Sequence, residues 1–275
     1  MVVNQRAPRL PARRKNELAA SVIKAGELTV SELAEQFGVS VDTVRRDLDE
    51  LAADGVLKRT HGGAVRNGTL SQAETPFPER IHVQGEAKRR IGELAASLIE
   101  DGQTILLNGG TTTLAVLPHL AGRRNLTVVT NNLLAPVEIP SQCARDVYLL
   151  GGNVRVGSLV TVGPVEFPGT DGGHSHRIQA DIALISVGGV GAEMGYSTSN
   201  LHEARMMLEM MKSSRLVVVL ADSSKFGRSI FAQVAELSAA DMLITDQPVP
   251  ARLAELLATA QVKVKVAAMG PRDGS

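Results

Sequence analysis

The residues best suited to bind a ligand lie directly after an apolar run that ends at Leu107. They read Asn108, Gly109, Gly110, Thr111, Thr112 and Thr113. Glycines let the backbone approach a ligand closely, hydroxyls can donate hydrogen bonds, and the amino terminus of the helix expected near Leu114 favours an anion. The segment therefore predicts a phosphate-binding turn. The alternative is an ordinary glycine turn whose threonines only cap the helix.

A second set of polar residues follows the apolar run that ends at Leu220. Lys225 offers a positive charge for a phosphate, and Asp222 can accept hydrogen bonds from sugar hydroxyls. Residues after two further runs complete the predicted ligand site: Asn131, Gly151 and Gly152. The set suits a small polyhydroxy phosphate better than a dinucleotide, because no Gly-x-Gly-x-x-Gly turn with a later ribose-binding acid is evident.

Other chemistries have less support. His174 and His176 could ligate a metal, but no Cys stands near them at ligand spacing, so we expect exposed loop residues and no metal. Asp222 and Lys225 could act as acid and base in an isomerase, yet no further group of carboxylates and histidine is evident beside them. We therefore expect no catalytic residues and no cofactor. Four methionines lie close together in the sequence: Met206, Met207, Met210 and Met211. Their flexible side chains suit adaptable packing or a subunit contact better than a cofactor site.

An α/β domain over residues 81–270 would position these strand ends. Short runs rich in Val, Ile and Leu alternate with amphipathic segments at 104–107, 126–130, 147–150, 181–187, 216–220, 243–245 and 262–267. Such runs predict mostly parallel strands covered on both faces, after a first helix at 86–100. Ligands of an open parallel sheet bind outside the carboxyl ends of its strands, where the polar residues stand.

A helix-turn-helix is predicted nearer the amino terminus. Thr29 and Glu32 fit a capping box, Gly38 suits the left-handed residue that ends the first helix, and Ser40 can cap the second. Apolar residues give each helix one buried face. The side chains left at the start of the second helix can reach bases and phosphates in a major groove: Ser40, Val41, Asp42, Thr43, Arg45 and Arg46. An ordinary helical hairpin is the alternative.

A small hairpin follows, with one strand over 56–60 and the next over 61–65. It is predicted to be a wing, whose Lys58, Arg59 and His61 could touch the DNA backbone or the minor groove. As isolated charges they fit a solvated surface equally well. The winged helix-turn-helix is expected to span 9–66, and residues 67–80 have the composition of a linker.

Composition limits the classes of function. The net charge is zero, and basic residues at 9–15 and 58–59 flank the helix pair, where they could neutralise phosphates. The single cysteine, Cys143, excludes an intramolecular disulfide. No apolar run has the roughly 18 residues of a membrane span, and no secretory signal is evident, so a cytoplasmic protein without a membrane partner is expected. Scarce aromatic residues disfavour stacking on single-stranded nucleic acid.

Several motifs together resemble the DeoR family of bacterial transcriptional regulators over nearly the whole chain. They lie at residues 44–48, 57–64, 77–80, 110–113, 126–131, 149–152 and 220–227. The resemblance implies a winged helix-turn-helix followed by a sensor domain similar in fold to ribose-5-phosphate isomerase. It also implies an oligomeric repressor of sugar-catabolism genes that a phosphorylated sugar releases from DNA. Three features depart from the family pattern: Asn108 replaces a usual Asp, Met207 a common Lys, and residues 169–176 lack the ordinary helical pattern.

The sequence thus predicts a DNA-binding repressor with double-stranded operator DNA and a sugar phosphate as partners, acting as a homo-oligomer. The first alternative is a sugar-phosphate isomerase-like enzyme with an appended DNA-binding domain. The second is a DNA-binding oligomer whose second domain only holds protomers together. Lys225 and the threonine-rich turn argue against the second alternative, and a turnover assay with sugar phosphates would test the first.

Overall fold

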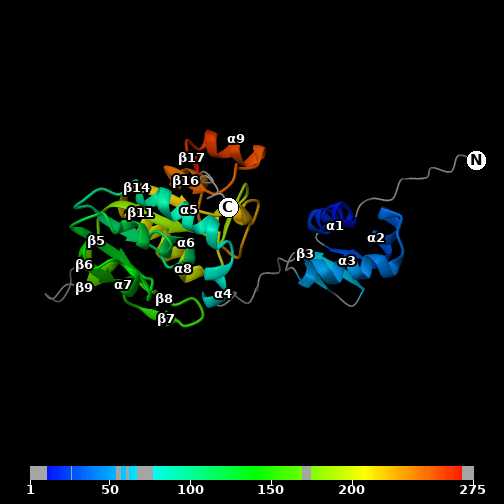
Figure 1. Cartoon of the computed structure of the whole chain (residues 1–275), viewed down its shortest axis with the longest axis horizontal. Coiled ribbons are helices and arrows are strands. Elements are labelled where there is room, and N and C mark those ends of the chain that lie inside the picture. The colour runs from blue at the N-terminus through cyan, green and yellow to red at the C-terminus, as the bar shows by residue number, and fades with distance from the viewer. Residues whose placement is uncertain are drawn as a thin grey trace, which may run out of the picture. The chain divides into compact units, whose positions relative to one another are not determined.

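The computed structural model of the chain describes residues 11–25, 27–53, 57–59, 62–66, 77–168 and 175–267. The chain divides into two compact units, Met1–Gln72 and Ala73–Ser275 (Figure 1). Within the described ranges, no helix is long and apolar enough to cross a membrane.

The first unit contains three helices and a small antiparallel sheet. The helices are α1 (Pro11–Ala25), α2 (Val30–Phe37) and α3 (Val41–Ala53), and the strands are β1 (Glu27–Thr29), β2 (Leu57–Arg59) and β3 (Gly63–Arg66). Both halves of the capping box are present, Gly38 adopts φ +65°, and the Ser40 hydroxyl accepts a hydrogen bond from the Thr43 amide at 3.2 Å. The predicted helix-turn-helix is therefore confirmed.

The wing is confirmed and is larger than expected. β3 pairs with β2 on one side and with β1 on the other. A Cβ atom on Gly63 would lie 2.2 Å from the Leu28 carbonyl oxygen, so glycine permits the close approach of β1 and β3. The strands predicted at 56–60 and 61–65 are found at 57–59 and 63–66, and Thr60 and His61 lie outside the described residues. Below the sheet, Leu18, Leu33 and further residues of α1 to α3 form one apolar core.

The second unit is built on a parallel sheet, which confirms the predicted α/β fold. Its order is β17-β16-β14-β11-β4-β5-β6, and every neighbouring pair is parallel. The bounds are β4 (Thr104–Leu107), β5 (Leu126–Thr130), β6 (Ala144–Leu149), β11 (Ala180–Ser186), β14 (Ser214–Leu220), β16 (Met242–Thr245) and β17 (Lys263–Val266). All seven predicted runs are strands of this sheet.

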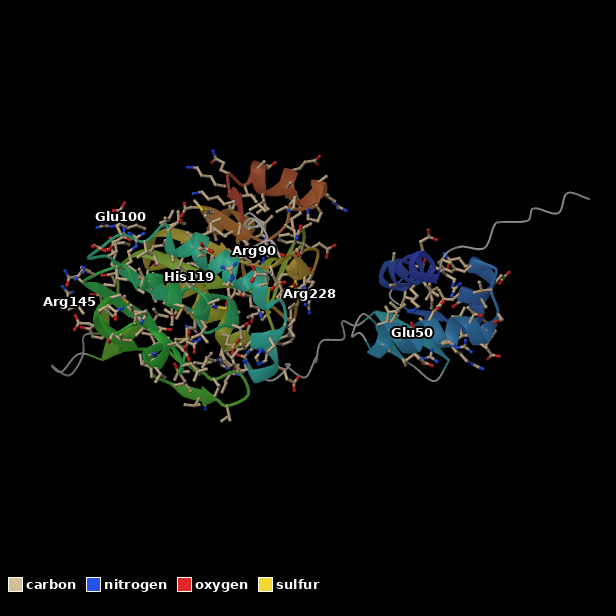
Figure 2. The ribbon with its side chains drawn as sticks, viewed as in Figure 1. Glu50, Arg90, Glu100, His119, Arg145 and Arg228 are labelled. Atoms are coloured by element: carbon tan, nitrogen blue, oxygen red, sulfur yellow. The ribbon has the colours of Figure 1, made fainter. Side chains whose placement is uncertain are left out.

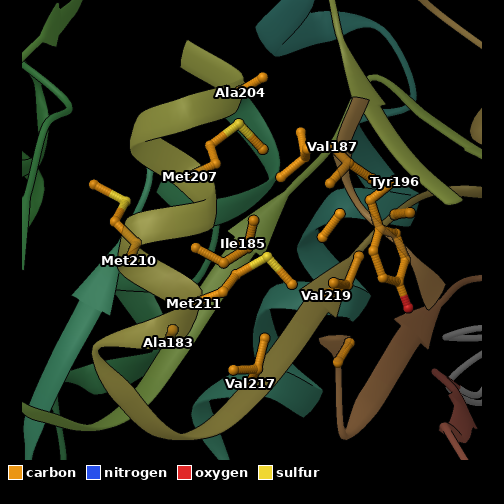
Figure 3. Close-up of a cluster of buried hydrophobic side chains, with 14 of the residues drawn as sticks. Ala183, Ile185, Val187, Tyr196, Ala204, Met207, Met210, Met211, Val217 and Val219 are labelled. Atoms are coloured by element: carbon orange, nitrogen blue, oxygen red, sulfur yellow. The ribbon is translucent and has the colours of Figure 1, made fainter. Parts of the chain in front are cut away.

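Each face of the sheet carries its own apolar cluster, because successive side chains of a strand point to opposite faces. Ile105 and Leu107 pack with Ile91 of α5 (Gly85–Ala96), whereas Leu106 packs with Met210 of α8 (Leu201–Lys212). Figure 3 shows Met207, Met210 and Met211 of α8 within the cluster that contains Leu106, and Met206 belongs to the same cluster, which confirms the predicted packing role of the four methionines. The remaining helical segments are α6 (Thr111–Leu114), α7 (Ala135–Glu138), α9 (Ala251–Thr259), η1 (Leu117–Leu120), η2 (Ser223–Lys225) and η3 (Leu237–Ala239).

Short antiparallel strands form further small sheets that are separate from the parallel sheet, and the sequence did not predict them. They are β7 (Asn153–Arg155) with β8 (Val160–Val162), β9 (Glu166–Pro168) with β10 (Ser175–Arg177), and β12 (Gly189–Gly191) with β13 (Gly195–Thr198) and β15 (Ala232–Ala235). Strands of three or four residues are too short for a clear alternating pattern. The departure from helical pattern expected at 169–176 falls largely outside the described residues.

Part of the predicted linker is a folded helix. α4 (Phe77–His82) belongs to the second unit, its Phe77 side chain is 1% exposed, and the Phe77 amide donates to the Gly157 carbonyl at 3.0 Å. Pro78 suggested a linker, yet proline is compatible with the first turn of a helix. The linker residues 67–76 lie outside the described residues.

Candidate functional site

Cationic side chains converge near the end of β14. Burial lowers the pKa of Lys88 to about 8, and the positive charges of Lys225 and Arg80 lower it further while Asp222 opposes them. Burial also lowers the pKa of Lys225, and Arg228 and Arg80 act in the same direction against Asp222. Four basic groups and one carboxylate therefore share one electrostatic environment that an anion would stabilise.

Lys88 enters this cluster from α5 and is only 6% exposed. Its Nζ donates hydrogen bonds to the carbonyl oxygens of Arg80 at 2.5 Å and Val83 at 2.6 Å. These carbonyls end α4, where a helix leaves its last acceptors unsatisfied and favours a positive charge. The Arg80 guanidinium lies 5.6 Å from the centre of the Phe77 ring. Lys88 thus fixes α4 beside the cluster.

Lys225 ends the short turn η2, which directly follows β14. Asp222 is 1% exposed, and its Oδ1 accepts hydrogen bonds from the amide of Ser224 at 3.1 Å and from the hydroxyl of the same residue. Asp246, from the end of β16, accepts from the Ser223 amide at 2.7 Å. Two buried carboxylates therefore hold η2 and present Lys225, which is partly exposed.

The glycine-threonine turn is held rigidly by two predicted ligand residues. The Asn108 side chain bonds the Ser186 carbonyl and amide, both at 2.8 Å. The Asn131 side chain accepts from the Gly109 amide at 2.6 Å and donates to the Thr161 carbonyl at 2.7 Å. Asn108 and Asn131 therefore engage the protein itself and position the turn.

The remaining residues of the turn differ in their access to a ligand. A Cβ atom on Gly109 would lie 2.0 Å from a side-chain carbon of Val160, and one on Gly110 would lie 2.0 Å from the Ser186 hydroxyl, so either substitution would displace a neighbouring side chain. The Thr113 hydroxyl donates to the Asn108 carbonyl at 2.7 Å and so stabilises the turn. Thr111 is partly exposed and Thr112 is buried. The predicted alternative, in which the threonines only cap the helix, is not observed, because α6 has no side-chain cap.

α4 and α5 connect the turn with the cationic cluster. Both helices contact α6, which contains Thr111 and Thr112, and the three helices lie together in Figure 1. Figure 2 labels Arg228, which flanks the cluster on the same unit. The structure therefore brings the Gly109–Thr113 turn and the Asp222–Lys225 turn to the same two helices.

Gly151 and Gly152 lie beside the β7–β8 hairpin, whose Val160 and Thr161 also contact Gly109 and Asn131. Gly152 adopts φ +131°, and a Cβ atom there would lie 2.2 Å from the Val162 carbonyl oxygen. A Cβ atom on Gly163 would lie 2.5 Å from the Gly151 carbonyl oxygen. The backbone conformation of Gly152 and its close approach to the β7–β8 hairpin thus account for glycine at 152 without a ligand, whereas a Cβ atom on Gly151 would meet no atom within 4 Å.

The predicted DNA-reading face is exposed on α3. Val41 is 38% exposed, Arg45 and Arg46 are exposed, and Thr43 is half-buried beside the Ser40 cap. Arg45 forms an ion pair with Asp42 at 3.3 Å. The face is available to a major groove.

Several basic residues near α3 are paired with its acids. Arg14 forms two hydrogen bonds with the buried Asp47, at 2.6 and 3.1 Å, and Lys15 pairs with Glu50. Arg59 pairs with Asp49 at 2.9 Å and donates to the Gly63 carbonyl at 3.0 Å. Their charges are partly neutralised within the unit. The side chains of Lys58 and His61 lie outside the described residues.

Sequence reasoning missed Arg80, Lys88 and Arg228. One signal was present for Lys88, because it stands three and seven residues before Ile91 and Ala95, on the apolar face of α5. A lysine on a buried helix face needs polar partners. Nothing in the local pattern marked Arg80 and Arg228.

A groove of about 1200 Å³ lies elsewhere, between α8 and the β7–β8 hairpin. Its lining includes Arg155, His202 and Glu209, but neither Lys225 nor the glycine-threonine turn. Among the residues that the structure describes, no group of three His, Cys, Asp or Glu side chains could hold a metal. His174 and the His176 side chain lie outside that part.

The chain matches two family models: "DeoR-like helix-turn-helix domain" over residues 14–69 and "DeoR C terminal sensor domain" over residues 83–247. The glycerol-3-phosphate regulon repressor of Escherichia coli (strain K12) is 30% identical over 255 residues, covering 92% of this chain and 98% of that protein. The HTH-type transcriptional regulator GlpR of Haloferax volcanii is 32% identical over 255 residues, covering 93% and 97%. A solved ribose 5-phosphate isomerase A from Methanocaldococcus jannaschii is 16% identical, with a TM-score of 0.34 and coverage of 52% and 55%.

Proposed function

Because the chain belongs to the DeoR family of transcriptional regulators, we propose that it represses carbohydrate-catabolism genes and that a phosphorylated sugar releases it from its operator. The observation that carries this proposal is the pair Lys88 and Lys225 beside Asp222, in the unit that matches the family's sensor domain. We place this activity in the cytoplasm, where operator DNA is found.

The first unit supplies the DNA contacts in this proposal. Arg45, Arg46 and the polar residues around the Ser40 cap lie at the start of α3, the part of a recognition helix that enters the major groove. Arg59 is held on the wing by Asp49 and the Gly63 carbonyl, and so has a fixed position for a backbone contact. Ion pairs of Arg14 and Lys15 with α3 hold the reading helix rather than supply phosphate contacts.

The second unit supplies the effector site. A phosphate dianion beside Lys88, Lys225, Arg80 and Arg228 would offset the charge repulsion that lowers both lysine pKa values. The exposed edge of the glycine-threonine turn adds a hydroxyl at Thr111, and the first amides of α6 have no acceptor within that helix. Asp222 can accept a hydrogen bond from a sugar hydroxyl. These features favour a small phosphorylated polyol or sugar.

Binding without turnover fits the geometry better than isomerase chemistry. Asp222 already accepts two hydrogen bonds from Ser224, and Lys88 already donates two to α4, so the protein holds both side chains in place while each keeps capacity for a further hydrogen bond to a ligand. The relatives named above are transcriptional regulators. A homo-oligomer is part of the proposal, because one recognition helix reads too few base pairs for genomic specificity.

Operator release under a panel of sugar phosphates tests the proposal. The full chain is bound to a fluorescent operator fragment, and anisotropy is followed while glycerol 3-phosphate, pentose 5-phosphates and hexose 6-phosphates are added singly. One of them is expected to release the DNA at micromolar to millimolar concentration and to remain chemically unchanged. Release by none of the phosphates, or conversion of the active one at an enzymatic rate, would contradict the proposal.

A further inference from the structure

The helix α4 is anchored differently at its two ends. Its first residue, Phe77, is buried, and the Phe77 amide donates to the Gly157 carbonyl at 3.0 Å. Towards the other end the apolar side chains are exposed, Ile81 by 38% and the following Val83 by 54%. A helix of six residues is marginal in water without tertiary contacts. The end of α4 therefore depends on polar contacts.

Lys88 supplies the polar contacts at that end. Its Nζ donates to the carbonyl oxygens of Arg80 and Val83, and it does so from α5, the helix that follows α4 (Figure 1). The two hydrogen bonds form a clasp on α4. An ammonium group has three N–H donors. Two of them serve the clasp, and the third has no acceptor among the residues that the structure describes.

The joint between the two helices has an unfavourable backbone conformation. Gln84, which precedes α5, adopts φ +56° and ψ +35°, in the left-handed region. A residue with a side chain adopts this conformation at a cost, and it persists only where surrounding contacts impose it. The clasp spans the joint, since Val83 lies on one side of Gln84 and Lys88 on the other. Opening the clasp would let Gln84 relax and α4 move about it.

The charges around Lys88 make the clasp sensitive to an anion. Burial lowers the pKa of Lys88 to about 8, against the opposing charge of Asp222. The positive charges of Lys225 and Arg80 lower it further. The same repulsion disfavours the ammonium group on which the clasp depends. A phosphate beside Lys225 would offset this repulsion and could accept the third N–H of Lys88.

From these contacts we propose that Lys88 is a positioning residue that couples the effector phosphate to α4: a bound phosphate holds the clasp closed, and loss of the phosphate lets α4 open about Gln84. The inference deepens the proposed function, on which it rests, because it names the element that responds to the effector. α4 is the first described element of the second unit. The closed clasp is then the arrangement that the effector binds more tightly, which is the requirement for release.

Hydrogen exchange of the full chain tests the clasp without DNA. The probe is inorganic phosphate, compared with sodium chloride at the same ionic strength. Phosphate is expected to slow exchange of the amides at 81–83 in the wild type and to leave their exchange unchanged in Lys88→Met. Lys212→Met removes an exposed lysine of α8 and is expected to keep the wild-type response. Absence of a response in the wild type, or an equal response in Lys88→Met, overturns the proposal.

Substitutions of Gln84 test the joint and leave the effector contacts intact, because this side chain is exposed and caps no helix. Gln84→Gly removes the left-handed penalty and favours the closed clasp, whereas the β-branched side chain of Gln84→Val increases the penalty. Gln84→Gly is expected to lower the sugar phosphate concentration needed for operator release and Gln84→Val to raise it, each by up to about tenfold.

Operator affinity without effector gives the reciprocal readout. Because effector and operator favour opposite arrangements, this affinity should fall in Gln84→Gly and rise in Gln84→Val. A joint with a merely structural role would change stability without moving release in opposite directions. Equal release curves for the two folded variants overturn the proposal. Release by none of the sugar phosphates contradicts the proposed function, whereas exchange with inorganic phosphate, measured without DNA, judges the clasp alone.

Discussion

Lys88 is a buried lysine whose charge is balanced by a carboxylate and two helix-end carbonyls rather than by water. Its pKa of about 8 lies below the usual 10.5. Between pH 8 and pH 10.5, Lys88 is protonated in the unfolded chain and largely deprotonated in the folded one. This residue therefore makes the free energy of unfolding rise with pH from about 8 to about 10.5. Below pH 8 both states are protonated, and the cost of the buried charge is fully present.

The same pKa predicts how effector binding depends on pH. A bound phosphate dianion favours protonated Lys88, so the affinity is expected to fall above pH 8, by at most about tenfold per pH unit for this one group. Isothermal titration with the active sugar phosphate from pH 7 to 9.5 measures the effect. Lys88→Met should bind more weakly with a flatter profile. A wild-type affinity that is constant over this range would remove Lys88 from the site.

Arg45 and Arg46 are the exposed cations of the reading helix. We expect Arg45→Ala and Arg46→Ala to weaken binding to all DNA sequences and to reduce the salt dependence of binding by about one unit for each DNA phosphate that the substitution leaves unbound. Fluorescence anisotropy at several salt concentrations measures both quantities. Arg89→Ala, an exposed arginine of the second unit paired with Glu86, is the matched control. Unchanged affinity and slope in both α3 variants would refute the role of these arginines in DNA binding.

At the level of elements, the Arg14–Asp47 pair joins α1 to the reading helix α3. Asp47 is 4% exposed and accepts two hydrogen bonds from the guanidinium. Such a pair fixes the angle of α3, which packing of small apolar residues alone would define less sharply.

Asp47→Asn is expected to destabilise the first unit by about 1 to 3 kcal/mol, because it leaves a partly buried guanidinium without its charged partner. Asp42→Asn, which removes the exposed partner of Arg45, should change stability by less than about 0.5 kcal/mol. Hydrogen exchange of the α1 and α3 amides measures both. Equal protection in the two variants would show that the buried pair adds nothing beyond a surface pair.

At the level of the whole molecule, the two units must be coupled, since the effector binds one unit and the DNA binds the other. An effector can release DNA only if it binds the released arrangement more tightly, and such coupling is typically about 1 to 3 kcal/mol. α4 is suited to take part, because it is the first described element after residues 67–76 and Lys88 holds its end beside the effector site.

Variants of the two units are therefore expected to separate the two activities. Lys225→Ala and Thr111→Val should leave operator affinity unchanged while raising the sugar phosphate concentration needed for release, by about tenfold or more for Lys225→Ala. Arg46→Ala should weaken operator binding and leave the affinity for the sugar phosphate unchanged. Titrations of each variant with operator and with effector measure this. A wild-type response to the effector in both sensor variants would remove these residues from the site.

The sequence by itself determined the features that depend on neighbours in the chain. The capping box of Thr29 and Glu32, the left-handed Gly38 and the apolar runs of all seven parallel strands follow from spacings of a few residues. Local sequence also identified Lys225 and the glycine-threonine turn as candidate ligand residues, because each lies in the loop that follows a predicted strand.

Only the tertiary structure decided which polar groups are available to a ligand and which are used within the protein. Asn108 and Asn131 bond Ser186 and Thr161, far along the chain, and Arg14 meets Asp47 across two helices. Lys88 entered the proposed effector site for the same reason, because only the packing of α5 places it near Asp222 and Lys225. Such pairings depend on how distant segments pack, and a side chain of given type can satisfy its hydrogen bonds with protein or with ligand, so local sequence leaves the choice open.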